Sequence, residues 1–196
     1  MSTNVGVAYE RLTQLEIEDA RCYLECARDN VLGATEGLSE TQWNYRPASG
    51  GWPVAGLVEH MVVIQELVLG PFAQALADSP ETPGVDALAI DAIIKQRFPD
   101  RSQKFPAPEF VHPTGRWTAS ESLSRLSANT QRLIERLEST PGLRQHRVPS
   151  PPLKAITGGE YQLMDGYHWI LATAAHTERH TNQILEVKGE PGFPAS

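Results

Sequence analysis

The sequence predicts an all-α protein, a four-helix bundle whose helices run up and down and are joined by long crossover loops. Four long segments repeat apolar residues at the three- and four-residue spacing of a helix that buries one face. No segment of any length alternates apolar and polar residues as a half-buried strand does. Amphipathic helices of similar length bury their stripes against one another, which favours a bundle.

Length and composition fit one domain. The chain has 196 residues and a mass of 21.6 kDa, with 40% hydrophobic and 21% charged residues. These values are typical of a globular chain large enough to bury a core. We therefore expect a single helical-bundle domain over residues 1–196, in which residues 189–196 form a frayed tail.

The charge excludes some partners. The net charge is −7 and no Lys/Arg cluster is present, which argues against nucleic-acid binding. The longest apolar run, from Val54 to Ala77, contains Glu59, His60 and Glu66, so we expect no membrane span. The first residues lack the basic and apolar regions of a secretory signal, which favours a cytoplasmic location.

The first helix is expected from about Tyr9 to Leu32, ending before Gly33. It carries two cysteines, Cys22 and Cys26, which are too few for a disulfide framework and are expected to stay reduced. A short helical segment follows from residue 39, where Ser-x-x-Gln is a capping-box pattern.

The second helix is expected to begin at Pro53, because proline fits the first helical position, and to run to about Ala77. Gly70 and Pro71 interrupt it, so a kink or an early end is expected there. Its apolar stripe consists of Val54, Leu57, Val58, Met61, Ile64, Val68 and Phe72.

Proline-rich connections flank the third helix. Residues 78–117 contain one short helical candidate at 85–98 and a long irregular stretch, and loops of that length are often functional. The third helix is expected over 120–138, with Thr118 or Ser120 as the cap and Glu121 as the box partner of Thr118. A second proline-rich link leads to the fourth helix, expected from Gly159 or Glu160 to Lys188.

Three histidines are candidate metal ligands. His176 and His180 stand four residues apart in AAHTERHTNQILEV, so they share one face at the edge of the apolar stripe of the fourth helix. His60 lies on one flank of the stripe of the second helix and could complete a set of three. Three imidazoles leave coordination positions open, which is the catalytic pattern, and they suit zinc, nickel, copper or iron.

A second interpretation of these residues stays open. With six histidines in the chain, an i, i+4 pair arises easily by chance, and His176 and His180 would then meet only water and neighbouring charges. His60 alone is more often a hydrogen-bonded boundary residue than a ligand. The other three histidines, His112, His146 and His168, match no ligand position.

Three passages carry a family resemblance. They are RPASGGWPVAGLVEHM (46–61), FVHPTGRWTASESL (110–123) and HTERHTNQI (176–184). Together they resemble the DinB-like, damage-inducible superfamily of metal-binding four-helix bundles. The resemblance implies that His60, His176 and His180 bind one divalent transition metal, namely zinc, nickel, manganese or iron. It also matches Gln183 to a trailing glutamine, which either orients a ligand or is a packing amide.

Two kinds of reaction and one binding role remain as hypotheses. The resemblance favours a thiol-dependent S-transferase that uses a low-molecular-weight thiol on a small electrophile. The residues equally permit a metal-dependent hydrolase with Glu59 as a possible base. A non-catalytic metal-binding stress or scaffold protein is the third alternative. Trp52 and Trp169 either line a substrate cavity or pack in the core. We expect a small-molecule substrate and, from the resemblance, a homodimer.

Overall fold

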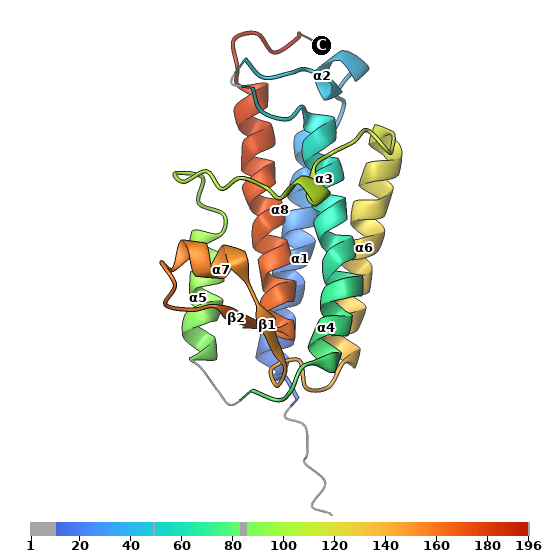
Figure 1. Cartoon of the computed structure of the whole chain (residues 1–196). Coiled ribbons are helices and arrows are strands. Elements are labelled where there is room, and N and C mark those ends of the chain that lie inside the picture. The colour runs from blue at the N-terminus through green and yellow to red at the C-terminus, as the bar shows by residue number, and fades with distance from the viewer. Residues whose placement is uncertain (1–10, 49, 83–85, 196) are drawn as a thin grey trace, which may run out of the picture.

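Four long helices lie side by side in the computed structural model, which describes residues 11–48, 50–82 and 86–195 (Figure 1). They are α1 (Gln14–Thr35), α3 (Val54–Leu67) with its continuation, α6 (Ala119–Ser139) and α8 (Gly166–Lys188). The predicted four-helix bundle is confirmed.

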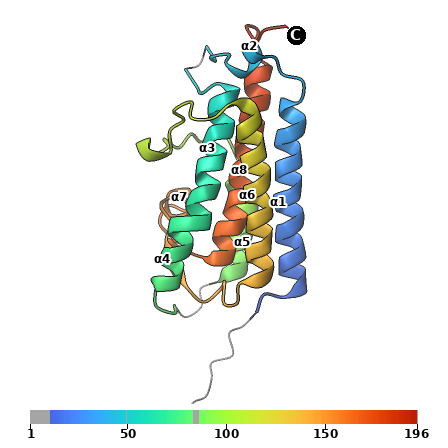
Figure 2. The same ribbon diagram turned by 90° about the vertical axis from the view of Figure 1, so that its right-hand side faces the viewer.

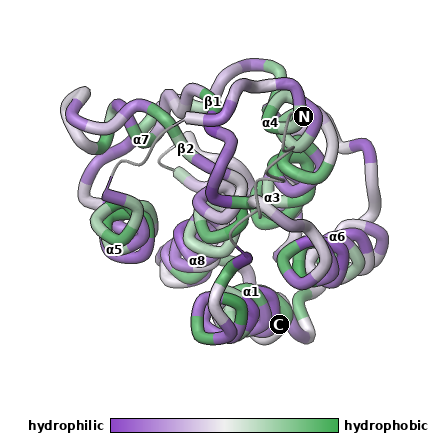
Figure 3. The backbone as a smooth tube through the Cα atoms, turned by 90° about the horizontal axis from the view of Figure 1, so that it is seen from below, coloured by the Kyte–Doolittle hydropathy of each residue, from purple (hydrophilic) through white to green (hydrophobic). Residues whose placement is uncertain are grey.

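The bundle has an uncommon order of helix directions. Seen along its axis, α1 packs on α6 and α8, and α3 packs on the other side of the same two helices (Figure 3). Successive helices run up, down, down and up, since α3 and α6 are parallel (Figures 1 and 2). The long crossover at 79–118 explains this order, because it returns the chain to the end where α3 begins. Simple alternation of up and down therefore does not hold.

Helix α1 begins and ends later in the sequence than predicted. Thr13 caps it and Glu16 completes a capping box, a signal that the prediction of a start at Tyr9 missed. Tyr9 itself lies outside the described residues. The helix continues through Gly33 to Thr35, which is buried. Both cysteines are free and exposed, as expected.

The second predicted helix is a continuous run of three elements. Helix α3 passes into a π-helix, η1 (Val68–Phe72), and then into α4 (Ala73–Asp78). Pro71 lies inside η1, so the predicted interruption is a turn of π-helix, and the helical run does not end there. The run of 25 residues is long and apolar enough, by composition, to cross a membrane, but 61% of its most apolar window is buried inside the bundle.

The start of the fourth helix was predicted six or seven residues too early. Asp165 caps α8 by accepting from the backbone N–H of His168, so the helix begins at Gly166. Residues preceding it form strand β2 (Leu163–Asp165), which pairs antiparallel with β1 (Arg147–Pro149). Strands of three residues are too short to give an alternating pattern, so the sequence did not indicate this hairpin.

Smaller elements flank the bundle. Helix α2 (Glu40–Trp43) has the predicted Ser39 cap, and α5 (Ala87–Arg97) packs on α8. Helix α7 (Pro151–Ile156) follows β1, and a 3-10 turn, η2 (Glu109–Val111), precedes α6. Two residues of the C-terminal tail contact the region of α2. Phe193 contacts the Tyr45 ring edge-on at 5.4 Å, and the Pro194 carbonyl accepts from Gln42 at 3.0 Å.

Candidate metal centre

Helices α3 and α8 bring His60, His176 and His180 together. Nε2 of His176 lies 3.1 Å from Nε2 of His60 and 3.1 Å from Nε2 of His180. One ligand atom from each of the three residues lies within 4.8 Å of the other two. The structure thus brings the three predicted ligands to one point, across a separation of more than 110 residues in the sequence.

The spacing of these nitrogens fits one metal ion. Metal–nitrogen bonds of about 2.0–2.1 Å at angles of 90–109° hold ligand nitrogens about 2.9–3.4 Å apart. Both 3.1 Å separations fall in that range. Hydrogen bonding alone does not account for the cluster, because Nε2 of His176 faces two nitrogens and carries at most one proton.

Hydrogen bonds on the far side of two rings fix where their lone pairs point. Nδ1 of His60 donates to the Val111 carbonyl at 2.9 Å, and a carbonyl can only accept. Nδ1 of His180 lies 3.0 Å from Oε1 of Gln183, which also can only accept. Each ring therefore carries its proton on Nδ1 and presents Nε2 as a free ligand atom, the arrangement that partner groups impose at metal sites.

A chain of polar contacts extends outward from His180. Oε1 of Gln183 also accepts from Nη1 of Arg101 at 3.0 Å, and the Arg101 fork binds both oxygens of Glu186 at 2.7 Å. Gln183 thus orients a candidate ligand, which decides between the two roles considered for it. The sequence did not indicate a role for Arg101 at this site, because the residue lies in an irregular loop.

The three imidazoles are in the protonation state that a metal requires. Burial lowers the pKa of His60, and burial together with the two neighbouring rings holds the pKa of His176 well below its ordinary value. Burial and the neighbouring His60 ring lower the pKa of His180 to about 3. All three rings are therefore neutral at pH 7, as metal binding demands. Nδ1 of His176 is buried and has no hydrogen-bond partner among the described residues.

Glu59 anchors a loop and is not brought into the histidine cluster. Its carboxylate is 2% exposed and accepts from the backbone N–H groups of Thr114 and Gly115, both at 2.8 Å, and from Nε of Arg116 at 3.0 Å. Burial alone would raise the pKa of Glu59, but these hydrogen bonds and the Arg116 charge lower it overall. A carboxylate so engaged is a poor general base, so the predicted role for Glu59 is corrected to an anchor.

The loop that Glu59 anchors lies directly against the centre. It carries Val111, whose carbonyl holds His60. Gly56, one turn before His60, allows this approach, because a Cβ there would lie 3.1 Å from Pro113 and 3.3 Å from Trp52. The proline-rich crossover is therefore part of the site and not only a connection.

The two tryptophans have different surroundings. Trp52 lies beside the centre, with its ring 4.9 Å from the His60 ring and 5.5 Å from that of His112. Trp169 is 7% exposed and packs on Phe72 at 4.5 Å, which is core packing. Only Trp52 thus borders the candidate site.

The remaining histidines lie elsewhere, as expected. His112 follows η2 and its Nε2 lies 2.9 Å from the Ala107 carbonyl. His146 precedes β1 and holds the Ser79 carbonyl. His168 is fully buried between Asp91 and Asp165, near the start of α8.

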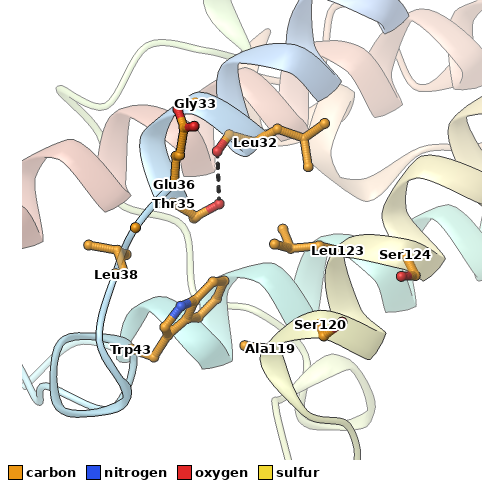
Figure 4. A pocket seen from close by; sticks show the side chains of 11 residues that line it. Leu32, Gly33, Thr35, Glu36, Leu38, Trp43, Ala119, Ser120, Leu123 and Ser124 are labelled. Atoms are coloured by element: carbon orange, nitrogen blue, oxygen red, sulfur yellow. Dashed lines mark hydrogen bonds between the residues drawn. The ribbon is translucent and has the colours of Figure 1, made fainter.

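Two hollows lie apart from the candidate metal centre, and none of its three histidines lines either of them. The larger, about 610 Å³, is an open groove between the end of α1 and the start of α6, with Leu32, Trp43 and Leu123 on its walls (Figure 4). The smaller, about 380 Å³, lies where α4, α6 and α8 meet.

Comparison with known proteins supports the fold and the family. The sequence model of the DinB superfamily matches residues 23–184. A solved structure, that of YfiT from Bacillus subtilis, is similar over 94% of this chain and 93% of its own, with a TM-score of 0.61 and 16% identity. YfiT is described as a probable metal-dependent hydrolase with an unusual four-helix bundle topology. No curated protein sequence matches the chain.

Proposed function

Since the chain belongs to the DinB superfamily, we propose that it is a metal-dependent hydrolase of a small substrate. One observation carries the proposal: three neutral imidazoles converge through Nε2, and no carboxylate or thiolate of the described residues joins them. Three protein ligands leave room for water and substrate, whereas structural sites are closed by four. The description of YfiT supports the same reaction class.

The chain's own residues have definite tasks in this proposal. His60, His176 and His180 hold the divalent ion, and Val111 and Gln183 keep two of the rings aimed at it. The chemistry supplied by such an ion, when bound, is Lewis-acid activation of water near neutral pH. Trp52 forms an apolar wall beside His60, which favours a substrate with an apolar group next to the bond that is cleaved.

Thiol transfer is the finer alternative that the family resemblance implies. The same ion would favour the thiolate form of a bound low-molecular-weight thiol, which could then attack an electrophile. The chain's own thiols do not contribute, since Cys22 and Cys26 are exposed on α1. Nothing in the described site selects a thiol over water, so hydrolysis is the simpler proposal.

Activity assays of metal-loaded protein separate these functions. Metal-free protein would be loaded in turn with zinc, nickel, manganese and iron and tested on p-nitrophenyl esters, amides and phosphodiesters. A parallel assay would follow conjugation of glutathione, bacillithiol or mycothiol to 1-chloro-2,4-dinitrobenzene. His176→Ala serves as the site variant, and His146→Ala, at the other end of the bundle beside the Ser79 carbonyl, as the matched control.

The hydrolase proposal expects turnover that needs metal, needs no thiol, is lost in His176→Ala and persists in His146→Ala. Conjugation without hydrolysis would replace the proposal with S-transfer. Metal binding without either activity would favour the non-catalytic alternative. Activity that survives metal removal would reject a metalloenzyme of any kind.

A further inference from the structure

The smaller cavity is an apolar chamber at the far end of the bundle from α2. It is enclosed by η1, α4, the end of α6, the loop 140–146 and the start of α8. Its volume of about 380 Å³ is within the range of small-ligand sites. Most of its wall is aliphatic, formed by Val68, Ala73, Leu76, Ala77, Leu143 and Ile170.

A positive charge stands in this apolar wall without a counter-ion. Arg136 lines the cavity, and its Nη1 makes only a long contact, 3.5 Å, to the Leu69 carbonyl of η1. Burial lowers its pKa, and no charged group of the described residues acts against this effect. A partly buried guanidinium without an anion is costly, so this position favours an anionic guest.

Two further polar groups at the cavity lack partners. Nε1 of Trp169 and Oε1 of Gln145 are both buried without a hydrogen bond to any described residue, and Trp169 as a whole is 7% exposed. Buried polar groups are nearly always paired in folded proteins, so two such atoms in one cavity wall indicate a missing ligand. The Gln145 amide can present its oxygen or, after a half turn, its N–H₂ group.

We propose that this cavity binds a small monocarboxylate with an apolar chain. The planar guanidinium of Arg136 matches a carboxylate, Trp169 offers a second donor, and the aliphatic wall receives the chain. Trp169 precedes His176 by seven residues on α8, which places the cavity about 10 Å along the helix from the metal centre. The site is thus separate from the histidines and does not depend on the proposed hydrolase activity.

Calorimetric titration with octanoate tests the proposal, using the full chain in the presence of a chelator so that no metal binds the carboxylate. Octanol, which has the same chain without the charge, is the matched ligand control. Arg136→Gln removes the cation, and Arg132→Gln is the matched variant, since Arg132 is exposed one turn away on α6. Ala77→Trp fills the cavity without changing the charge.

We expect saturable octanoate binding at one site, at least tenfold weaker binding of octanol, and at least a tenfold loss in Arg136→Gln but not in Arg132→Gln. Ala77→Trp should abolish binding. Octanoate should also change tryptophan fluorescence, and Trp169→Phe should remove that change. Arg136→Met, which removes the charge and keeps an aliphatic side chain, serves if Arg136→Gln does not fold. The proposal is overturned if octanoate does not bind, if octanol binds equally well, or if the Arg136 variants bind like the wild type.

Discussion

His60 of α3 donates its Nδ1 proton to the carbonyl of Val111 at 2.9 Å, so a residue of the long crossover orients a ligand of the candidate metal centre. The crossover is held in place by Glu59, the residue next to His60 in the sequence. The loop, the anchor and the ligand therefore form one unit. Changes to the crossover should affect metal affinity even where they leave the three histidines untouched.

Gln183 should contribute to metal affinity through His180. Its Oε1 fixes the His180 ring at 3.0 Å, and loss of such a partner typically lowers metal affinity roughly 10–100-fold. We expect Gln183→Ala to weaken zinc binding by about this factor, as measured by competition with a chromogenic chelator. Asn182→Ala is the control, because Asn182 is exposed on the same helix. Equal affinities of the two variants would show that Gln183 is only a surface amide.

Glu59→Gln should affect stability and metal affinity more than the chemical step. The substitution removes a buried carboxylate that accepts from four donors, and hydrogen bonds to charged groups contribute about 1.5–3 kcal/mol. We expect a decrease of that size in the free energy of unfolding, measured in urea. The exposed pair of Glu66 and Arg125 provides the control, since Glu66→Gln should change stability by less than about 1 kcal/mol.

The role of Glu59 as an anchor can be separated from a role as a base by kinetics. If Glu59 only anchors the loop, Glu59→Gln under saturating metal should retain most of its turnover per bound ion. Loss of a general base would instead lower the turnover about 10²–10⁴-fold. A loss of that size in Glu59→Gln, with metal occupancy and stability unchanged, would restore the interpretation of Glu59 as the base.

A buried ion cluster should make stability depend on pH. Arg144 joins Glu16 of α1 to Asp91 of α5, at 2.8 and 2.6 Å. Burial alone would raise the pKa of Asp91, but hydrogen bonds from His168 and Arg144 lower it overall. A carboxyl with a lowered folded pKa stabilises the fold above its unfolded pKa of about 3.9 and loses this contribution as pH falls through the folded value.

We therefore expect Asp91→Asn to lower the free energy of unfolding by about 1.5–3 kcal/mol at pH 6, with the deficit shrinking below about pH 4. Urea unfolding of both proteins between pH 3 and pH 7 measures this difference. Asp29→Asn, at an exposed pair with Arg28, should change little at any pH. A deficit for Asp91→Asn that is the same at pH 3 and pH 6 would contradict the assignment.

We propose that the chain forms a homodimer, as its family resemblance implies. Sedimentation equilibrium at micromolar concentration should then give twice the chain mass of 21.6 kDa. Two large apolar side chains, Leu15 and Leu88, are 78% and 74% exposed and are candidates for the contact. A mass near that of a single chain would reject the dimer.

The sequence predicts the bundle well because apolar stripes carry a strong periodic signal. The four-residue spacing of His176 and His180 makes them candidate ligands through local helical geometry alone. The family resemblance was needed to favour a metal site and to add His60 to it. The start of α8 was missed because Asp165 takes His168 as its box partner, a pairing outside the usual Glu or Gln pattern. Local sequence patterns therefore predict the presence of a helix better than they predict the residue at which it begins.

The parts of the site that depend on the loop could not be predicted. Val111 acts through its carbonyl, which every residue has, so no side chain signals its role. Arg101 reaches Gln183 from an irregular stretch without periodicity. Glu59 looked like a base because it is next to His60, but adjacent residues of a helix point in different directions, and its carboxylate faces the loop.

Elemental analysis of the purified chain is the most direct test of the metal centre. Wild-type protein, dialysed after loading with zinc, should retain about one ion per chain at the three-histidine site. His60→Ala, His176→Ala and His180→Ala should each lose it, while His146→Ala, at the other end of the bundle, should keep it. Retention of the ion by all three site variants, or no ion in the wild type under any loading condition, would contradict the account.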